Sequence, residues 1–292
     1  MHTSSDAQHE YVDGQGRAWF PELLAGFQRD SDEAARSQAA RLDQAYGPHP
    51  RQRLDIFPSP APARGVMLYL HAGYWQSRDK ALFRWLAPAF GQRGLHVVLA
   101  NYPLCPEVTL PALVEALRPA LAAAHAAEPA WAALPLVVAG HSAGAHLASE
   151  FGLSECGPPA GRAGHVAGVW AISGIYELEP LRHTTLNERL RLDGPLARRM
   201  SPLHRVGRAG MPAVWLVGGG ETLEFLRQNR AMHLAWQAQG HWSACVEAPG
   251  ADHFTVLQRW ATLDDGLDAV FDDWWTAVAT RRAGGPGLRP AG

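Results

Sequence analysis

The stretch Pro135-Leu-Val-Val-Ala-Gly-His-Ser-Ala-Gly144 decides the fold of this chain. Its apolar and partly β-branched run, residues 136–139, predicts a buried strand. The strand leads directly into a G-x-S-x-G motif, and residues 145–152 after it suit a helix. A bare G-x-S-x-G is weak in a chain with 29 glycines, but the flanking strand and helix make it specific. Ser142 is therefore expected at the tip of a tight turn, where the two flanking glycines leave room for neighbouring backbone.

Composition narrows the class of protein. A length of 292 residues suits one large α/β domain, and 47% apolar residues are ample for its core. The net charge of −2 and pI of about 6.7 favour neither nucleic acid nor an anionic membrane as partner. Three cysteines without C-x-x-C spacing predict no disulfide framework and a reducing compartment. The polar N-terminus is no signal peptide and no apolar run could span a bilayer, so we expect a cytoplasmic protein.

Strand and helix patterns alternate from residue 16 to about 280, which predicts a single domain. The expected strands are residues 53–57, 65–70, 95–101, 136–139, 166–173, 213–217 and 244–247. Helical segments between most of them predict a mostly parallel sheet with helices on both faces. Residues 175–209 carry little strand pattern and are expected to form a small helical cap. We expect residues 1–15 to be disordered and 281–292 to be a flexible tail.

The segments that could do chemistry follow predicted strands directly. They are His71-Ala-Gly-Tyr-Trp75, Ser142 and His253. Because parallel strands end at one edge of the sheet, where ligands bind, these segments should meet there. A serine hydroxyl needs a base within hydrogen-bond reach and an acid that orients the base. His253, in a short glycine-containing loop after the last strand, is the expected base.

The acid has three candidates. In the α/β-hydrolase arrangement, which the serine motif indicates, the nucleophile, acid and histidine follow one another along the chain. Glu221 lies after the 213–217 strand, in the acid position. Glu224 is expected to face outward from the following helix. Asp252 adjoins His253 in the sequence, and the side chains of neighbouring residues seldom point at each other. Chain order favours Glu221, with Glu224 and Asp252 as alternatives.

The loop after the 65–70 strand is expected to complete the site. An oxyanion hole would combine the backbone N–H of Ala143 with that of Gly73 or Tyr74. Tyr74 and Trp75 adjoin these donors and are expected to wall a pocket for a small aromatic substrate. His71 is expected to hold the loop through a hydrogen bond rather than to transfer protons.

No motif for a metal or cofactor stands out. His141 and His146 lack H-E-x-x-H spacing, and no dinucleotide or Walker loop occurs, so we expect neither group. Trp260, Trp274 and Trp275 are expected to be exposed on the terminal helical segment. They could form a contact between two copies of the chain, which makes a homodimer a further expectation.

Taken together, these segments resemble those of α/β-hydrolases of the kynurenine formamidase (arylformamidase) group, which are relatives of the small H-G-G-type esterases. The resemblance covers roughly residues 46–257 and rests on the segments Arg53-Leu-Asp-Ile-Phe57, His71-Ala-Gly-Tyr-Trp75, Asn101-Tyr-Pro-Leu-Cys-Pro106, Gly140-His-Ser-Ala-Gly144, Ser173-Gly-Ile-Tyr-Glu-Leu178, Thr185-Leu-Asn187, Glu221-Thr-Leu-Glu-Phe225 and Gly250-Ala-Asp-His253. The nucleophile and histidine motifs are shared by many hydrolases, whereas H-x-G-Y-W, S-G-I-Y and E-T-x-E-F are narrower. The chain departs from the pattern at Ala72, where a glycine is expected, and in having Glu rather than Asp as the acid.

The resemblance implies Ser142 as nucleophile, Glu221 as acid and His253 as base. It implies hydrolysis of an N-formyl aryl amine, N-formylkynurenine being the family's substrate, through a formyl-serine and without a cofactor. A carboxylesterase acting on short-chain or aryl esters is the alternative within this class, because the triad does not distinguish an ester from an activated formamide. A catalytically silent α/β-hydrolase that serves as a binding module is the alternative from another class.

Overall fold

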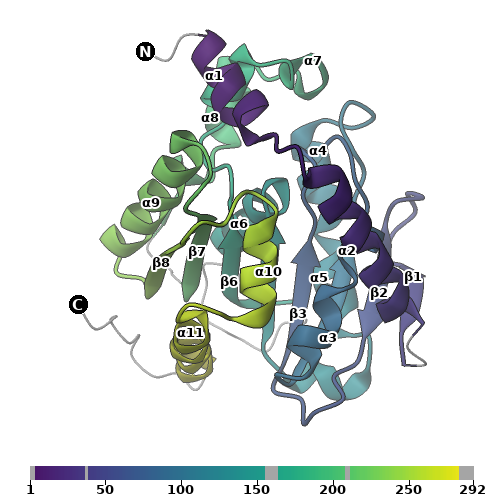
Figure 1. Ribbon diagram of the computed structural model, residues 1–292. Coiled ribbons are helices and arrows are strands. Elements are labelled where there is room, and N and C mark those ends of the chain that lie inside the picture. Colours follow the sequence, from purple (N-terminus) through teal and green to yellow (C-terminus); the bar gives the residue numbers. More distant parts are fainter. Residues whose placement is uncertain (1–3, 37–38, 155–163, 208–210, 283–292) are drawn as a thin grey trace.

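A mostly parallel sheet forms the centre of the computed structural model, which describes residues 4–36, 39–154, 164–207 and 211–282 (Figure 1). Its eight strands lie in the order β1-β2-β4-β3-β5-β6-β7-β8. Their bounds are β1 Arg41–Ala45, β2 Arg53–Phe57, β3 Gly65–Leu70, β4 Leu95–Ala100, β5 Leu136–His141, β6 Val166–Ile172, β7 Ala213–Gly218 and β8 Ser243–Ala248. Strands β4 to β8 in this order are parallel, and β1 and β2 extend the sheet in antiparallel pairing. The predicted α/β fold is confirmed.

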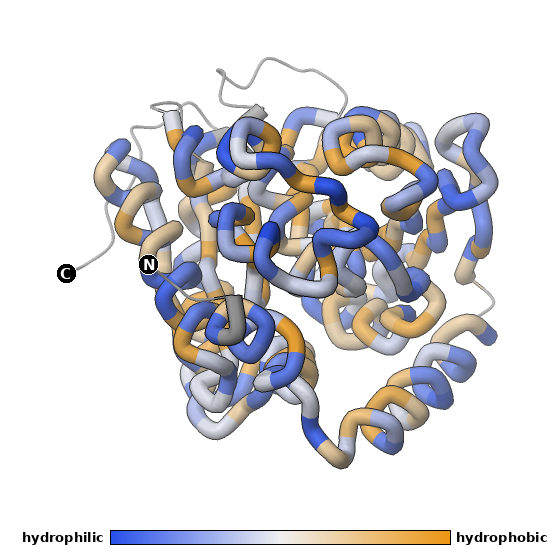
Figure 2. The backbone as a smooth tube through the Cα atoms, turned by 90° about the horizontal axis from the view of Figure 1, so that it is seen from above, coloured by the Kyte–Doolittle hydropathy of each residue, from blue (hydrophilic) through white to orange (hydrophobic). Residues whose placement is uncertain are grey.

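Helices cover both faces of the sheet. Their bounds are α1 Ser4–Tyr11, α2 Phe20–Ala35, α3 Leu86–Gly91, α4 Leu110–Leu117, α5 Pro119–His125, α6 Ala143–Ser154, α7 Asn187–Leu190, α8 Gly194–Arg199, α9 Leu223–Ala238, α10 Thr255–Thr262 and α11 Leu267–Arg282. Helices α4, α5, α6 and α9 contribute to the core on one face, and α2, α3, α10 and α11 to the core on the other. Every residue of β3, β4, β5 and β7 is buried, which explains why these strands are continuous apolar runs. Figure 2 shows polar and apolar segments alternating along α2, as expected for an amphipathic helix, and α2 contacts the short helix η2 Lys80–Phe83 and α3.

A small helical cap follows β6. It consists of the short helices η4 Glu179–His183, α7, α8 and η5 Pro202–His204. Helix α1 contacts η4 and α9, so the N-terminal segment extends this cap (Figure 1).

Residues 4–15 differ from the disorder expected for them. They form α1 and the short helix η1 Asp13–Gln15, and both Ala7 and Tyr11 are buried. The Tyr11 hydroxyl donates a hydrogen bond to Oε2 of Glu224 over 2.8 Å. Glu224 lies more than two hundred residues from Tyr11 along the chain, so the polar sequence of α1 does not reveal this contact. Of the expected tail, residues 281–282 belong to the end of α11, and residues 283–292 lie outside the described residues, as do residues 1–3.

The tryptophans near the C-terminus also differ from expectation. Trp260, Trp274 and Trp275 are all buried, because α10 and α11 turn them toward the sheet. Trp274 packs edge-on against Trp170 of β6, with ring centroids 5.2 Å apart. Their predicted exposure was wrong, and a homodimer stays a prediction without their support.

Two further expectations concern cysteines and membranes. Cys105 and Cys245 are free thiols, and Cys156 lies outside the described residues. Within the described part of the chain, no helix combines the length and the apolar character needed to cross a membrane.

Candidate active site

Ser142 occupies a sharp turn between β5 and α6. Its backbone is left-handed, with φ of 57°, a conformation uncommon for a residue other than glycine. The turn is held because Ser142 N donates to Ile172 O over 2.8 Å. A Cβ atom on Gly140 would lie 2.1 Å from Gly144 O, and one on Gly144 would lie 2.0 Å from Leu70 O. The two glycines of the motif are therefore required for the backbone to close around the serine.

His253 and Glu221 form a buried pair beside this turn. Nδ1 of His253 lies 2.6 Å from Oε2 of Glu221, and both residues are less than a tenth exposed. Because a carboxylate only accepts hydrogen bonds, Nδ1 carries the proton and Nε2 is left to accept one. His253 and Ser142 line the same cavity of about 200 Å³. The pair has the arrangement of a base and an acid that orients it, and the role of Ser142 as the nucleophile stays a prediction.

Ser173 supports the acid. Its hydroxyl donates to Oε1 of Glu221 over 2.5 Å, and Gly218 N donates to the same oxygen over 2.8 Å. One oxygen of the Glu221 carboxylate thus accepts the hydrogen bonds that fix its position, and the other oxygen accepts the hydrogen bond from His253. The sequence predicts no role for Ser173, although this residue directly follows β6, in the same relation to its strand as the other site residues.

The other two candidates for the acid have different partners. Glu224 is buried rather than facing outward, which corrects the expectation, and it pairs with Arg227 over 2.8 Å besides accepting from Tyr11. Oδ1 of Asp252 accepts hydrogen bonds from the backbone N–H groups of Phe254 and Thr255. Of the three carboxylates, Glu221 contacts His253.

His71 holds the loop after β3, as expected. Its Nδ1–H donates to Ala72 O over 2.7 Å, and its ring stacks on Tyr102 with centroids 4.4 Å apart. The Tyr102 hydroxyl donates to His71 O over 2.7 Å. Burial lowers the pKa of His71 to about 4, so the ring is neutral near pH 7.

The expected oxyanion loop has an unusual backbone. Gly73, Tyr74 and Trp75 have φ of 131°, 51° and 60°, whereas Ala72 is not among the residues with positive φ. Alanine in place of the expected glycine therefore causes no left-handed strain. Gly73 and Tyr74 line the cavity beside Ser142, and Ala143 begins α6. Their roles as N–H donors stay predictions.

Tyr74 and Trp75 lie in different surroundings. Tyr74 lines the cavity, and its hydroxyl donates a hydrogen bond to Tyr11 O. Trp75 is completely buried and packs edge-on against His146, with centroids 5.0 Å apart. It lies behind the loop and is not among the residues that line the cavity, so Tyr74 is the aromatic wall on this side.

A wall of the cavity that was not predicted comes from residues 12–20, which we call the N-terminal strap. Val12, Gln15, Gly16 and Phe20 line the cavity. The strap also contacts the loops that carry Glu221 and His253. Gln15 donates to Thr222 Oγ1 over 2.8 Å, Arg17 donates to Gly220 O over 2.9 Å, and Trp19 donates to Asp252 Oδ2 over 3.0 Å. Sequence patterns could not reveal these contacts, since each joins residues more than two hundred positions apart.

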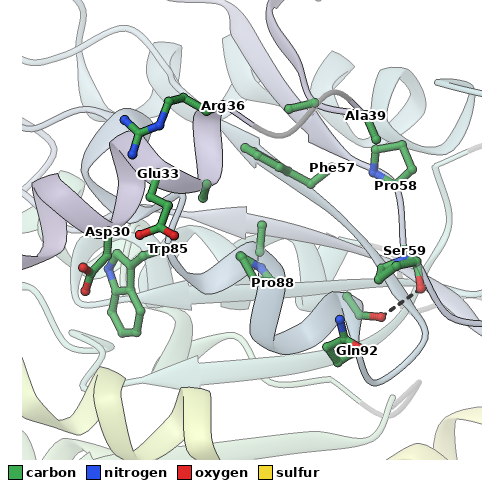
Figure 3. A pocket seen from close by; sticks show the side chains of 15 residues that line it. Asp30, Glu33, Arg36, Ala39, Phe57, Pro58, Ser59, Trp85, Pro88 and Gln92 are labelled. Carbon is green, nitrogen blue, oxygen red and sulfur yellow. Dashed lines mark hydrogen bonds between the residues drawn. The ribbon is translucent and has the colours of Figure 1, made fainter.

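A larger hollow of about 750 Å³ lies elsewhere, between the end of α2, the end of β2 and α3 (Figure 3). Because β2 is antiparallel to β4, its last residues lie at the opposite end of the sheet from Ser142. The Ser59 hydroxyl in this hollow donates to backbone carbonyls at Ala61 and Gly91. Among the described residues, no group of three or more His, Cys, Asp or Glu side chains could hold a metal ion.

Comparison with known proteins supports the fold. A family model described as the α/β hydrolase fold matches residues 67–257. The chain belongs to the α/β-hydrolase family. The kynurenine formamidase of Danio rerio is 28% identical over 79% of this chain and 80% of its own length, and that of Drosophila melanogaster is 25% identical over 80% and 81%.

Solved structures similar to this α/β-hydrolase show the same fold. A Silicibacter protein provisionally described as a thioesterase is 30% identical, covers 91% of this chain and 98% of its own, and has a TM-score of 0.78. Esterase 2 of Thermogutta terrifontis is 21% identical, covers 80% and 95%, and has a TM-score of 0.61, which supports the fold alone. The predicted resemblance to the arylformamidase group is confirmed, and the chain is a hydrolase.

Proposed function

We propose that this hydrolase removes the formyl group from an N-formyl aryl amine, N-formylkynurenine, and releases formate and the free amine. The contact of Glu221 with His253, which lines the same cavity as Ser142, is the observation that supports the proposal most strongly. Two relatives named kynurenine formamidase point to the same substrate. The cavity of about 200 Å³ lies below the usual range for drug-sized ligands, which favours a small substrate.

The reaction would proceed through a formyl-serine. As the Ser142 hydroxyl attacks the formyl carbon, its proton passes to Nε2 of His253. The oxyanion would accept hydrogen bonds from the N–H of Ala143, at the positive end of α6, and from that of Gly73 or Tyr74. When the C–N bond breaks, the leaving amine takes the proton from His253.

Deformylation of the serine would use the same groups. A water molecule attacks the formyl ester while Nε2 of His253 accepts its proton. The tetrahedral intermediate then releases formate, and the proton returns to the oxygen of Ser142. Glu221 would stabilise the imidazolium in both halves of the reaction without being protonated. None of these steps needs a cofactor.

A carboxylesterase on short-chain or aryl esters is the second candidate, because esterases share this fold. The test is kcat/KM of the purified protein for N-formylkynurenine and for p-nitrophenyl butyrate, with Ser142→Ala as the control. We expect a clear preference for the formamide. A large preference for the ester would replace the formamidase proposal with the esterase, and labelling by a fluorophosphonate without turnover of either compound would contradict both substrates.

A catalytically silent binding module is the candidate from another class. The same fluorophosphonate reagent separates it from an enzyme, since labelling requires an activated serine. Complete failure of the folded protein to label would favour the silent module.

A further inference from the structure

One charged side chain of the cavity has no part in the proposed triad. Arg78 lines the cavity together with Ser142 and His253. Its side chain is half-buried, and the guanidinium carbon lies 4.8 Å from the centroid of the Phe254 ring. Stacking on an aromatic face fixes the plane of a guanidinium and leaves the N–H groups at its edge available.

Arg78 is an uncompensated cation. Among the described residues, no carboxylate lies within ion-pair distance of its guanidinium, and no group accepts a hydrogen bond from it. Arg84, by contrast, pairs with Asp55 over 2.6 Å. Arg64, which stacks on two aromatic rings, also has no ion pair among the described residues, but it lies away from this cavity. Burial of a cation without a partner costs free energy, and it lowers the pKa of Arg78 here. The fold tolerates this cost at a position beside the nucleophile.

The backbone of Arg78 is held in a fixed place. Its φ of 70° is left-handed, although the residue is not glycine. Arg51 donates to Arg78 O over 2.8 Å and to Tyr102 O over 2.9 Å. The next residue, Asp79, caps the short helix η2 Lys80–Phe83 by accepting from Ala81 N. Strain of this kind persists where the surrounding structure imposes it, and it concentrates at functional sites.

We propose that Arg78 is a specificity residue that binds a carboxylate of the substrate. The forked N–H groups of arginine match a carboxylate with two parallel hydrogen bonds. Because Arg78 and Ser142 share one small cavity, the carboxylate belongs to the same small molecule as the carbonyl group that is attacked. The inference rests on the proposed function in one respect, that the substrate is an acylated aryl amine, and N-formylkynurenine carries such a carboxylate on its amino-acid side chain.

The test compares two substrates that differ only in this charge. They are N-formylkynurenine and its α-carboxamide, and the readout is the ratio of their kcat/KM values. Arg78→Gln keeps an N–H donor in the side chain but removes the positive charge and the paired N–H groups of the guanidinium. Arg78→Lys keeps the positive charge but not the paired N–H groups. A hydrogen-bonded charge pair predicts a ratio lowered by roughly 10- to 150-fold in Arg78→Gln, mainly through KM, and by less in Arg78→Lys.

Arg118→Gln is the matched control, because Arg118 pairs with Glu115 at the surface, and it should keep the wild-type ratio. An unchanged ratio in Arg78→Gln overturns the inference. An equal loss on both substrates also overturns it, since Arg78 would then act on the reacting group or on the fold. If Arg78→Gln does not fold, Arg78→Lys decides by the same ratio.

A binding measurement separates this inference from the proposed function. Inhibition of p-nitrophenyl butyrate hydrolysis by kynurenine and by its carboxamide does not require turnover of a formamide. If kynurenine inhibits more strongly than its carboxamide, and Arg78→Gln abolishes the difference, the carboxylate site stands even when formamide turnover is absent. If formamide turnover is present but neither inhibition nor the kcat/KM ratio depends on Arg78, the inference fails and the proposed function stands.

Discussion

Nδ1 of His253 lies 2.6 Å from Oε2 of Glu221, although the two residues are 32 positions apart in the chain. Glu221 follows β7 and His253 follows β8, and these strands pair in parallel from Ala213 opposite Ser243 to Gly218 opposite Ala248. The register therefore brings both loops to one edge of the sheet. The Glu221 side chain is fully buried, so water screens its interaction with His253 little. An imidazolium formed during the reaction would be stabilised there.

Replacing this carboxylate tests its role in orienting the base. Glu221→Gln should lower kcat by about 10³–10⁴-fold, because the amide can present the wrong group to Nδ1 of His253. Glu224→Gln is the matched control, since Glu224 bonds to Tyr11 and Arg227 instead. Steady-state kinetics on N-formylkynurenine measure both variants. A larger loss of kcat in Glu224→Gln than in Glu221→Gln would reassign the acid.

Ser173 is expected to position the acid. Ser173→Ala removes the hydroxyl that donates to Glu221, and a hydrogen bond to a charged group of this kind predicts a kcat lowered by about tenfold or more. KM should change little, because Ser173 is not among the residues that line the cavity. Ser149→Ala removes a buried hydroxyl that bonds to Ala145 O within α6, and it serves as the control. An equal loss of kcat in the two variants would mean that Ser173 has no specific role.

A buried charge cluster predicts a loss of stability. Asp55 is completely buried and lies 2.8 Å from Lys80 Nζ and 2.6 Å from Arg84 Nε. Asp55→Asn leaves Arg84 without its carboxylate and Lys80 with Asp43 alone, so the free energy of unfolding should fall by about 3–5 kcal/mol. Glu115→Gln breaks the exposed pair with Arg118 and should cost less than about 1 kcal/mol. Urea unfolding measures the free energy of unfolding of both variants. A loss in Asp55→Asn as small as that in Glu115→Gln would contradict the importance of the cluster.

Buried histidines predict destabilisation by acid. Burial lowers the pKa of His146 to about 3 from an ordinary value of 6.5. Between these two pH values the unfolded chain binds a proton that the folded chain does not, so the free energy of unfolding falls as the pH falls. The slope from one such group is up to about 1.4 kcal/mol per pH unit.

The variant that checks this is His146→Gln, whose amide can still donate to Met200 O as Nε2 of His146 does. Urea unfolding at several pH values between 5 and 6 should give a shallower dependence than in the wild type, by about one proton. An unchanged slope would show that His146 does not titrate on unfolding.

The turn at Ser142 could be predicted from sequence because its strand, glycines and helix are all local features. His253 and Glu221 could be placed by their positions after predicted strands, but their contact depends on the register of β7 and β8, which no local pattern contains. The N-terminal strap could not be predicted, since its contacts, such as Gln15 with Thr222 and Trp19 with Asp252, join residues more than two hundred positions apart. Arg78 could not be predicted either, because an arginine without a partner has no pattern in the sequence.

Ser142 is the proposed nucleophile, and kcat of Ser142→Ala for N-formylkynurenine tests this role most directly. Removal of the nucleophile from a serine hydrolase of this type predicts a kcat lowered by about 10⁶-fold, with the fold unchanged by circular dichroism. Turnover by Ser142→Ala within tenfold of the wild type would contradict the account.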